Sequence, residues 1–257
     1  MSQQVETLLK RAYKDDFGAH GHETLGHKAD ASAGHLMYGE LLPGGVSKAL
    51  HRLGAKSLAS DAGATLLELG SGTGKVALQA FLECPGVSRV VGVEISRGRH
   101  ETALAAVSRL SEQPGFSVSH AADGSVVLRD AAGRSLELQL GDLTATPASL
   151  VRDAAFVLLQ VVLPEQVATS TQRLLLSASE GCVAMLLQDL TRSWAIAEAC
   201  PFQPLQGADG DRFATSWSPV AGHKLHVYRV DRSVPATITQ ETAWRLTQDD
   251  RTEGHEL

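Results

Sequence analysis

The chain has 257 residues, of which 43% are hydrophobic and 20% charged, and its formal net charge is −6 at pH 7. This length suffices for one large α/β domain with a sizeable buried core. The charge argues against a strongly basic surface for nucleic acid, and no cluster of Lys and Arg is typical of a nuclear address. No apolar run approaches the length of a membrane span, and Met1–Lys10 lacks the apolar segment of a signal peptide.

The cysteines and histidines give little support to a metal site. The three cysteines are an odd number without metal-ligand spacing, which favours a reduced, intracellular compartment: Cys84, Cys182 and Cys200. Four histidines gather in one segment: His20, His22, His27 and His35. A metal site there is conceivable, but no cysteine accompanies them and their spacing matches neither a zinc finger nor a helical pair. We therefore predict a solvated loop without metal.

The first predicted elements lead to a buried strand. Gln3–Tyr13 is amphipathic and predicted to be helical, residues 14–35 are predicted to form a loop, and Val46–Leu58 is a helix candidate. Ala64–Leu69 is a short run that is apolar apart from Glu68. Such a run is typical of a parallel strand that is buried on both faces.

Helices and strands then alternate. We predict a helix over Lys75–Glu83, a strand over Arg89–Glu94 and a helix over Arg97–Leu110. Turn signals at Asp123-Gly124 and Ala132-Gly133 predict hairpins between three β-rich runs. These runs are Phe116–His120, Val126–Arg129 and Ser135–Leu140.

The last third of the chain completes the pattern. We predict a strand over Ala155–Val162, a helix over Glu165–Ser177 and a strand over Cys182–Leu187. An antiparallel pair is expected to follow, formed by Phe213–Trp217 and Leu225–Val230. This order predicts an α/β fold with a Rossmann-like seven-stranded sheet, helices on both faces and a C-terminal antiparallel hairpin. We divide the chain into an N-terminal helix and loop (1–35), a main domain (36–232) and a polar tail (233–257).

A glycine-rich loop joins the first predicted strand to its helix, with the sequence Leu69-Gly70-Ser71-Gly72-Thr73-Gly74. Glycines let the chain turn sharply and bring backbone N–H groups close to a ligand at a helix N-terminus. Glu94 follows about twenty residues later at the tip of the next strand, where a carboxylate can bind ribose hydroxyls. The pattern predicts a nucleoside-binding half-fold, the alternative being a turn that only connects strand to helix.

The spacing of the glycines indicates which nucleoside. A dinucleotide fingerprint needs a glycine at the position of Lys75. Here the pattern is acid-x-Gly-x-Gly-x-Gly, beginning at Glu68, and it resembles motif I of the Rossmann-like S-adenosylmethionine-dependent methyltransferases. An acid before the loop suits an amino-acid tail and a sulfonium better than a pyrophosphate. The resemblance implies S-adenosyl-L-methionine as cofactor, bound by Glu68, Gly70, Ser71, Gly72, Gly74, Lys75 and Glu94.

Three blocks together resemble the DOT family (disruptor of telomeric silencing), the histone-lysine methyltransferases without a SET domain. They are Tyr38-Gly39-Glu40, the run Leu69–Gln79 joined to Gly92-Val93-Glu94, and Ser216-Trp217 followed by Leu225-His226 and Asp231-Arg232. Gly141-Asp142-Leu143 also resembles a family block. The resemblance extends from about residue 35 to about residue 232 and implies a chromatin enzyme acting on histone lysine in the nucleus.

The resemblance also implies roles. Tyr38 and Trp217 would form a lid or the wall of the lysine channel, and Glu40 would contact the methionine end of the cofactor. Asp142, beside Leu143, would contact the adenine rather than cap a helix, since no convincing helix follows it. Gln160 would be the polar group beside the methyl, although a strand-end glutamine can equally satisfy loop backbone, and Trp217 can equally be hairpin core.

The departures concern the acceptor. The family's pair of asparagines after the fourth strand has no match here, and Gln160 is the nearest amide. Glu68 replaces an aspartate, Leu41 replaces a small hydroxyl residue, and Lys224 falls where an aromatic is expected. The basic nucleosome-binding extension is missing, although nucleosomal DNA is polyanionic.

Three functions therefore remain open. The first is a DOT-like protein-lysine methyltransferase. The second is a methyltransferase of the same fold acting on a non-histone protein or a small molecule, in which case a cytoplasmic location is expected. The third is a non-catalytic cofactor-binding protein.

Overall fold

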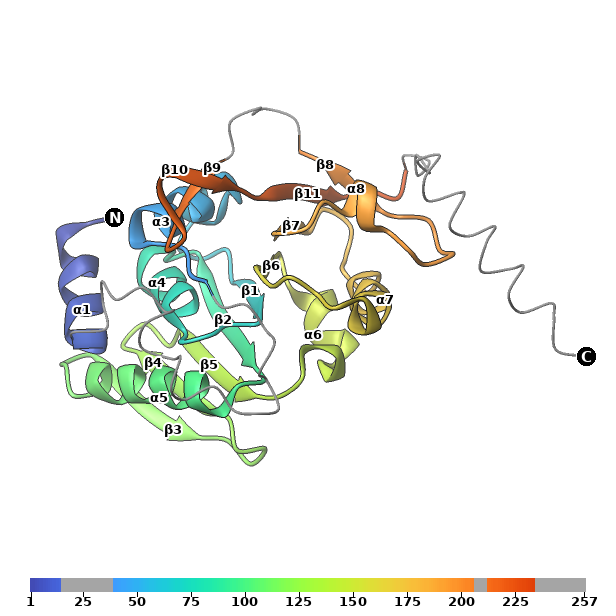
Figure 1. Ribbon diagram of the computed structural model, residues 1–257. Helices are drawn as coiled ribbons and strands as arrows, with labels where there is room; N and C mark the ends of the chain where they lie inside the picture. Colours follow the sequence, from blue (N-terminus) through green and yellow to red (C-terminus); the bar gives the residue numbers. More distant parts are fainter. Residues whose placement is uncertain (15–38, 206–211, 234–257) are drawn as a thin grey trace, which may run out of the picture.

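A mixed nine-stranded sheet forms the centre of the protein (Figure 1). The computed structural model describes residues 1–14, 39–205 and 212–233. In sheet order the strands are β3 (Phe116–His120), β4 (Val126–Asp130), β5 (Ser135–Leu140), β2 (Val87–Glu94), β1 (Ala64–Leu69), β6 (Phe156–Leu159), β7 (Val183–Leu186), β11 (His226–Val230) and β8 (Phe202–Pro204).

The direction of the strands is the one expected of the methyltransferase sheet. The strands β5, β2, β1, β6 and β7 are parallel, and β11 lies antiparallel between β7 and β8. Two antiparallel hairpins, β3 with β4 and β4 with β5, extend the sheet at the other edge. Without β3 and β4 the order is third, second, first, fourth, fifth, seventh, sixth along the chain. The fold prediction is confirmed.

Helices cover both faces of the sheet (Figure 1). One face packs against α1 (Gln3–Tyr13), α3 (Pro43–Arg52), α4 (Lys75–Glu83) and α5 (Arg97–Ser111). The other packs against α6 (Ala148–Asp153), α7 (Glu165–Leu175) and α8 (Leu190–Ser193). Successive residues of a strand point to opposite faces, so Leu66 lies in the first core and Leu67 in the second. This double burial explains why the central parallel strands β6 and β7 are apolar throughout.

Most predicted elements are confirmed, and several lie within a residue or two of their expected bounds. The predicted helix Val46–Leu58 has the wrong limits. It begins at Pro43, because proline suits the first helical turn, and it ends at Arg52. Gly54, with φ +86°, then separates α3 from the short 3₁₀ helix η3 (Ala55–Ser57).

The predicted pairing at the C-terminus is wrong. The strand β9 (Arg212–Thr215) pairs with β10 (Ser218–Lys224) as a separate two-stranded sheet, so that Ser216-Trp217 is the turn between them. The strand β11 instead enters the main sheet, because Val227, Tyr228 and Val230 are buried and need cover on both faces.

Among the described helices, none has the length and hydrophobicity needed to cross a membrane. The three cysteines are free thiols, and burial raises the pKa of Cys84 and of Cys182 to about 12.

Candidate functional site

The glycine loop lies at the carboxyl end of β1 and is held by the end of β2. The N–H groups of Gly70 and Ser71 donate to the carbonyl of Val93 at 2.8 and 2.9 Å. Gly70 has φ +79°, and a Cβ there would lie 2.2 Å from Cγ2 of Val161. Since L side chains rarely adopt this conformation and the space is filled, only glycine fits between the loop and the segment after β6.

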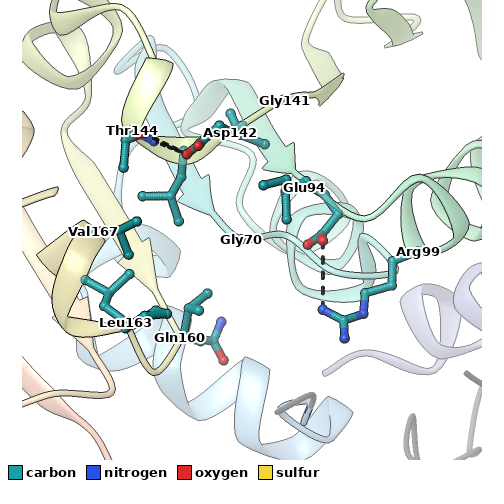
Figure 2. Close-up of a pocket in the computed structure, with 14 residues that line it drawn as sticks. Gly70, Glu94, Arg99, Gly141, Asp142, Thr144, Gln160, Leu163 and Val167 are labelled. Atoms are coloured by element: carbon teal, nitrogen blue, oxygen red, sulfur yellow. Dashed lines mark hydrogen bonds and ion pairs between the residues drawn. The ribbon is translucent and has the colours of Figure 1, made fainter. Parts of the chain in front are cut away.

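Glu94 ends β2 and is 3% exposed. Its Oε2 accepts the N–H of Gly72 at 2.7 Å, and its Oε1 accepts the N–H of Ser96 at 2.8 Å. Arg99 Nη1 lies 3.9 Å from the same Oε1 (Figure 2). A carboxylate has about four acceptor positions, so both oxygens can still accept a ligand hydroxyl.

A cavity of about 130 Å³ opens beside Glu94 (Figure 2). Ile95, which is 49% exposed, is one of its apolar walls, together with Leu143, Leu163 and Val167. In Figure 2, Leu163 and Val167 lie on one side of the cavity, with Glu94 and Arg99 on the other. Apolar walls with a few fixed polar groups are typical of a site for a small organic ligand. We call this the larger cavity.

A smaller cavity lies on the other side of the glycine loop. It is lined by the segment 39–41, by Glu68, by the loop itself and by the first turn of α4. Gly70 and Gln160 line both cavities, so the two meet at the end of β1 and of β6.

Glu68 lines the smaller cavity and has one buried oxygen without a hydrogen-bond partner among the described residues. The residue is 2% exposed, and its Oε1 accepts from Nε2 of Gln160 at 3.3 Å. Its Oε2 is buried without a hydrogen-bond partner among the described residues. Burial raises the pKa of Glu68 well above its usual range, an N–H of Ala77 lowers it in part, and the charges of Glu94 and Glu40 raise it further. A buried carboxyl of this kind needs a cationic partner in order to ionise.

Glu40 ties the segment 39–41 to the glycine loop. It is 8% exposed, and its carboxylate accepts hydrogen bonds from Oγ1 of Thr73 and, at 2.8 Å, from Nζ of Lys75. Its backbone pairs with Ser216, whose N–H donates to the Glu40 carbonyl at 2.8 Å and whose Oγ accepts from Glu40 N–H at 3.1 Å. The segment therefore bridges the β9–β10 hairpin and the loop.

Trp217 lies over Gly39. A Cβ on Gly39 would be 2.1 Å from Cζ3 of Trp217, and the indole meets the ring of His223 edge to face at 5.4 Å. Trp217 is 44% exposed, so it is not ordinary hairpin core. It covers the segment 39–41 and does not itself line either cavity.

Replacement of Gly39 by Ala is expected to displace the Trp217 ring, because the new methyl group has no room. The exposed ring can move outward, so the melting temperature should change by less than about 3 °C, the shift that corresponds to about 1 kcal/mol. Tryptophan fluorescence should report the displacement, with Gly44→Ala as control because nothing lies within 4 Å of its Cβ. An unchanged emission spectrum would contradict the contact.

The structure brings most of the predicted ligand residues together. Those lining one or both cavities are Glu40, Glu68, Gly70, Ser71, Gly72, Lys75, Glu94, Asp142, Leu143 and Gln160. Gly74 lines neither. It begins α4 in the left-handed conformation, and a Cβ there would lie 2.8 Å from Cβ of Ala103. Tyr38 lies outside the described residues.

The interpretation of Asp142 needs a correction. A short 3₁₀ helix, η4 (Leu143–Ala145), does follow it, and Asp142 caps that helix. Its Oδ1 accepts from the N–H and from the hydroxyl of Thr144, both at 2.8 Å (Figure 2). Asp142 still lines the larger cavity, so a contact with a ligand remains a prediction.

Two further expectations concern residues away from the cavities. Lys224 does not occupy a channel in the structure: it is exposed at the end of β10, opposite Arg212. The four clustered histidines lie outside the described residues. Within the described ranges, no group of three or more His, Cys, Asp or Glu side chains is placed to hold a metal ion.

Some site residues were not foreseen. Ile95 and Arg99 follow Glu94 closely in sequence, and their position after the strand tip was the available signal. Leu163, just before α7, and Val167, in its first turn, gave no such signal, because only the folded chain brings them opposite Glu94.

Comparisons with known proteins identify no family. No family model and no curated protein sequence matches the chain. Solved structures similar to it include an RNA methyltransferase from Salinibacter ruber in complex with S-adenosyl-L-homocysteine, at 18% identity over 76% of this chain and 95% of that chain, with TM-score 0.48. Others are the putative methyltransferase yhhF from Escherichia coli (10% identity, 73% and 86% covered, TM-score 0.45) and the tRNA (m1A58) methyltransferase TrmI from Aquifex aeolicus (14%, 74% and 69%, 0.44). With TM-scores below 0.5, these similarities carry no argument about substrate.

Proposed function

We propose that this protein is an S-adenosylmethionine-dependent methyltransferase. The observation that carries the proposal is the junction of the two cavities at Gly70 and Gln160. The larger cavity, with apolar walls beside Glu94, suits a nucleoside. The smaller cavity, with the unpartnered oxygen of Glu68, suits a cationic amino-acid tail. A ligand that joins an adenosine to a methionine through a sulfonium has both chemistries.

The residues of the site fit this ligand. Ile95 and Leu143 would hold the adenine by apolar contact, and Glu94 would accept the ribose hydroxyls. Glu68 would accept the ammonium group, which gives its buried oxygen the cation that it lacks. Gln160, at the junction, would lie closest to the sulfonium.

When bound, S-adenosylmethionine supplies an electrophilic methyl group on a positively charged sulfur. An in-line displacement of this kind needs alignment and exclusion of water more than acid–base chemistry. Gln160 meets the first need, because its side chain is fixed by the hydrogen bond to Glu68. The segment 39–41, covered by Trp217, would exclude water, because it closes one side of the smaller cavity.

For the acceptor we propose a protein lysine in a DOT-like arrangement. The supporting observation is that the segment containing Glu40 and the turn Ser216-Trp217, two blocks of the family resemblance, pack against each other beside the glycine loop. The net charge of −6 does not favour a nucleosome, so a non-histone protein fits better than histone. A small molecule, or binding without catalysis, are the alternatives.

The test is transfer of labelled methyl from S-adenosylmethionine by the purified protein. Free histones, nucleosomes, total cellular RNA and a cell lysate serve as acceptors in parallel, with Gly72→Arg as the inactive variant. We expect label on lysate proteins, lost with Gly72→Arg, and release of methylated lysine on hydrolysis of the product.

Each of the other outcomes would change the proposed function in a different way. Label on nucleosomal histone would restore the chromatin assignment, and label on RNA or on a small molecule would replace the lysine acceptor. Cofactor binding without transfer to any acceptor would leave a non-catalytic binding protein, and no binding of cofactor would remove the proposal altogether.

A further inference from the structure

We propose that helix α1 is part of the cofactor site, with Tyr13 and Lys75 as positioning residues that set the affinity for the amino-acid end of the ligand. The inference rests on the proposed function and extends it to a segment outside the glycine motif. It is carried by a ring of contacts among four residues from three separate segments of the chain.

Tyr13 is the last residue of α1 and is 1% exposed. Its hydroxyl donates to the backbone carbonyl of Thr73, in the middle of the glycine loop, at 3.0 Å. Burial and the charges of Glu40 and Glu68 raise the pKa of Tyr13, so the hydroxyl keeps the proton that it donates. The loop is thus fixed from outside by a helix that begins at the third residue of the chain.

Lys75 links the same tyrosine to the segment 39–41. Its Nζ lies 5.6 Å from the centroid of the Tyr13 ring and 2.8 Å from Oε2 of Glu40. The other oxygen of Glu40 accepts from the Thr73 hydroxyl. Tyr13, Thr73, Lys75 and Glu40 therefore close a ring, in which a cation–π contact, an ion pair and two hydrogen bonds meet at low exposure.

The position of α1 does not depend on this ring. Leu9 and Ala12 are buried in the core, and Arg109 of α5 donates to the Ala12 carbonyl. At the other end of the helix, the side chain of Ser2 accepts the N–H of Val5. A firmly placed helix can hold a glycine loop in one conformation, and a preorganised site binds more tightly.

The ring touches one cavity only. Glu40, Thr73 and Lys75 line the smaller cavity, and none of the four residues lines the larger one. Loosening the ring should therefore lower the affinity for ligands that carry the amino-acid tail. The affinity for ligands without the tail should stay the same. A purely structural role for Tyr13 would not produce this difference.

The experiment compares two ligands on five proteins by calorimetry. The ligands are S-adenosylhomocysteine, which carries the tail, and 5′-methylthioadenosine, which lacks it. The proteins are the wild type, Tyr13→Phe, Lys75→Met, Lys75→Arg and the control Tyr228→Phe. Tyr228 is also 1% exposed and its hydroxyl bonds to Asp189 at 2.9 Å, away from both cavities.

We expect Tyr13→Phe and Lys75→Met to lower the affinity for S-adenosylhomocysteine by about 5- to 20-fold, the effect of one lost hydrogen bond or ion pair. The affinity for 5′-methylthioadenosine should fall by less than about twofold. Lys75→Arg should keep most of the affinity, and Tyr228→Phe should change neither ligand although it lowers the melting temperature. Equal losses for both ligands, or no loss for either, would overturn the inference. Failure of the wild type to bind either ligand would instead overturn the proposed function.

Discussion

Replacement of Glu94 by Ala is expected to abolish measurable binding of S-adenosylmethionine and to lower the free energy of unfolding by about 2–4 kcal/mol. The loss of binding follows from the place of Glu94 at the end of β2, where it is the carboxylate beside the apolar walls of the larger cavity. The loss of stability follows from its other partners. Without the carboxylate, the N–H groups of Gly72 and Ser96 lose their acceptor inside the protein.

Glu94→Gln sharpens this prediction. The amide keeps the volume of the side chain but replaces one oxygen by an NH₂ group, which would then face an N–H of Gly72 or Ser96. Two donors cannot satisfy each other, so this near-isosteric change should also disrupt the loop. Both variants are measured by denaturant unfolding and by calorimetry with cofactor.

Glu137→Gln is the matched control for Glu94. Glu137 lies on β5, next to β2 in the sheet, and pairs with the half-exposed Arg89 at 2.7 Å. Because solvent reaches the Arg89 side of this ion pair, it contributes about 0–1 kcal/mol, so stability should fall only slightly and cofactor affinity should not change. If Glu94→Ala bound cofactor as tightly as Glu137→Gln does, Glu94 would not be a ligand residue.

The sequence predicted the parts of the site that depend on local chemistry. The glycine loop could be predicted because its three glycines all adopt positive φ, a conformation that few other residues adopt. Glu94 could be predicted because it is the last residue of the strand that follows in the sequence. Glu68 was predicted from its distance to Gly70, and Gln160 from its position after a buried strand; both line the smaller cavity, and their roles stay predictions.

The rest of the site depends on tertiary packing. The wall residues Leu163 and Val167 lie just before α7 and in its first turn, and α7 follows β6 on the opposite face of the sheet from α4. The contact between Tyr13 and Thr73 joins residues 60 positions apart, and no local pattern indicates it. The C-terminal pairing was wrong for the same reason, since only burial distinguishes β10 from β11 as the strand that completes the main sheet.

Replacement of Glu68 by Gln is expected to change stability and cofactor affinity in opposite directions. Glutamine keeps an acceptor for Gln160 and is neutral without having to bind a proton, so the free protein should be more stable than the wild type above the usual pKa of a glutamate. The same change removes the anion that the ammonium and sulfonium of the cofactor favour, so affinity should fall by at least about tenfold, or about 1.4 kcal/mol.

The stability of the free protein should depend on pH through Glu68. The pKa of Glu68 in the folded protein lies well above the usual value of 4.5. Between these two values the native state holds a proton that the unfolded chain has released, so stability falls as the pH rises through this window. Glu68→Gln should remove this fall. Glu83→Gln should instead lower the stability of the protein at neutral pH. Burial raises the pKa of Glu83, but hydrogen bonds from Lys56, Gln79 and Ser47 outweigh this effect and lower the pKa, so the charge of Glu83 stabilises the fold.

Cofactor binding should then release a proton. The positive charges of S-adenosylmethionine favour the ionised form of Glu68, so the proton that the free protein holds must leave when the ligand enters. Calorimetry in two buffers of different ionisation enthalpy measures this release, which should be seen for the wild type and should be absent in Glu68→Gln. Equal release by both proteins would mean that another group titrates, and Glu68 would then be a buried residue of the loop rather than the partner of the ligand's cation.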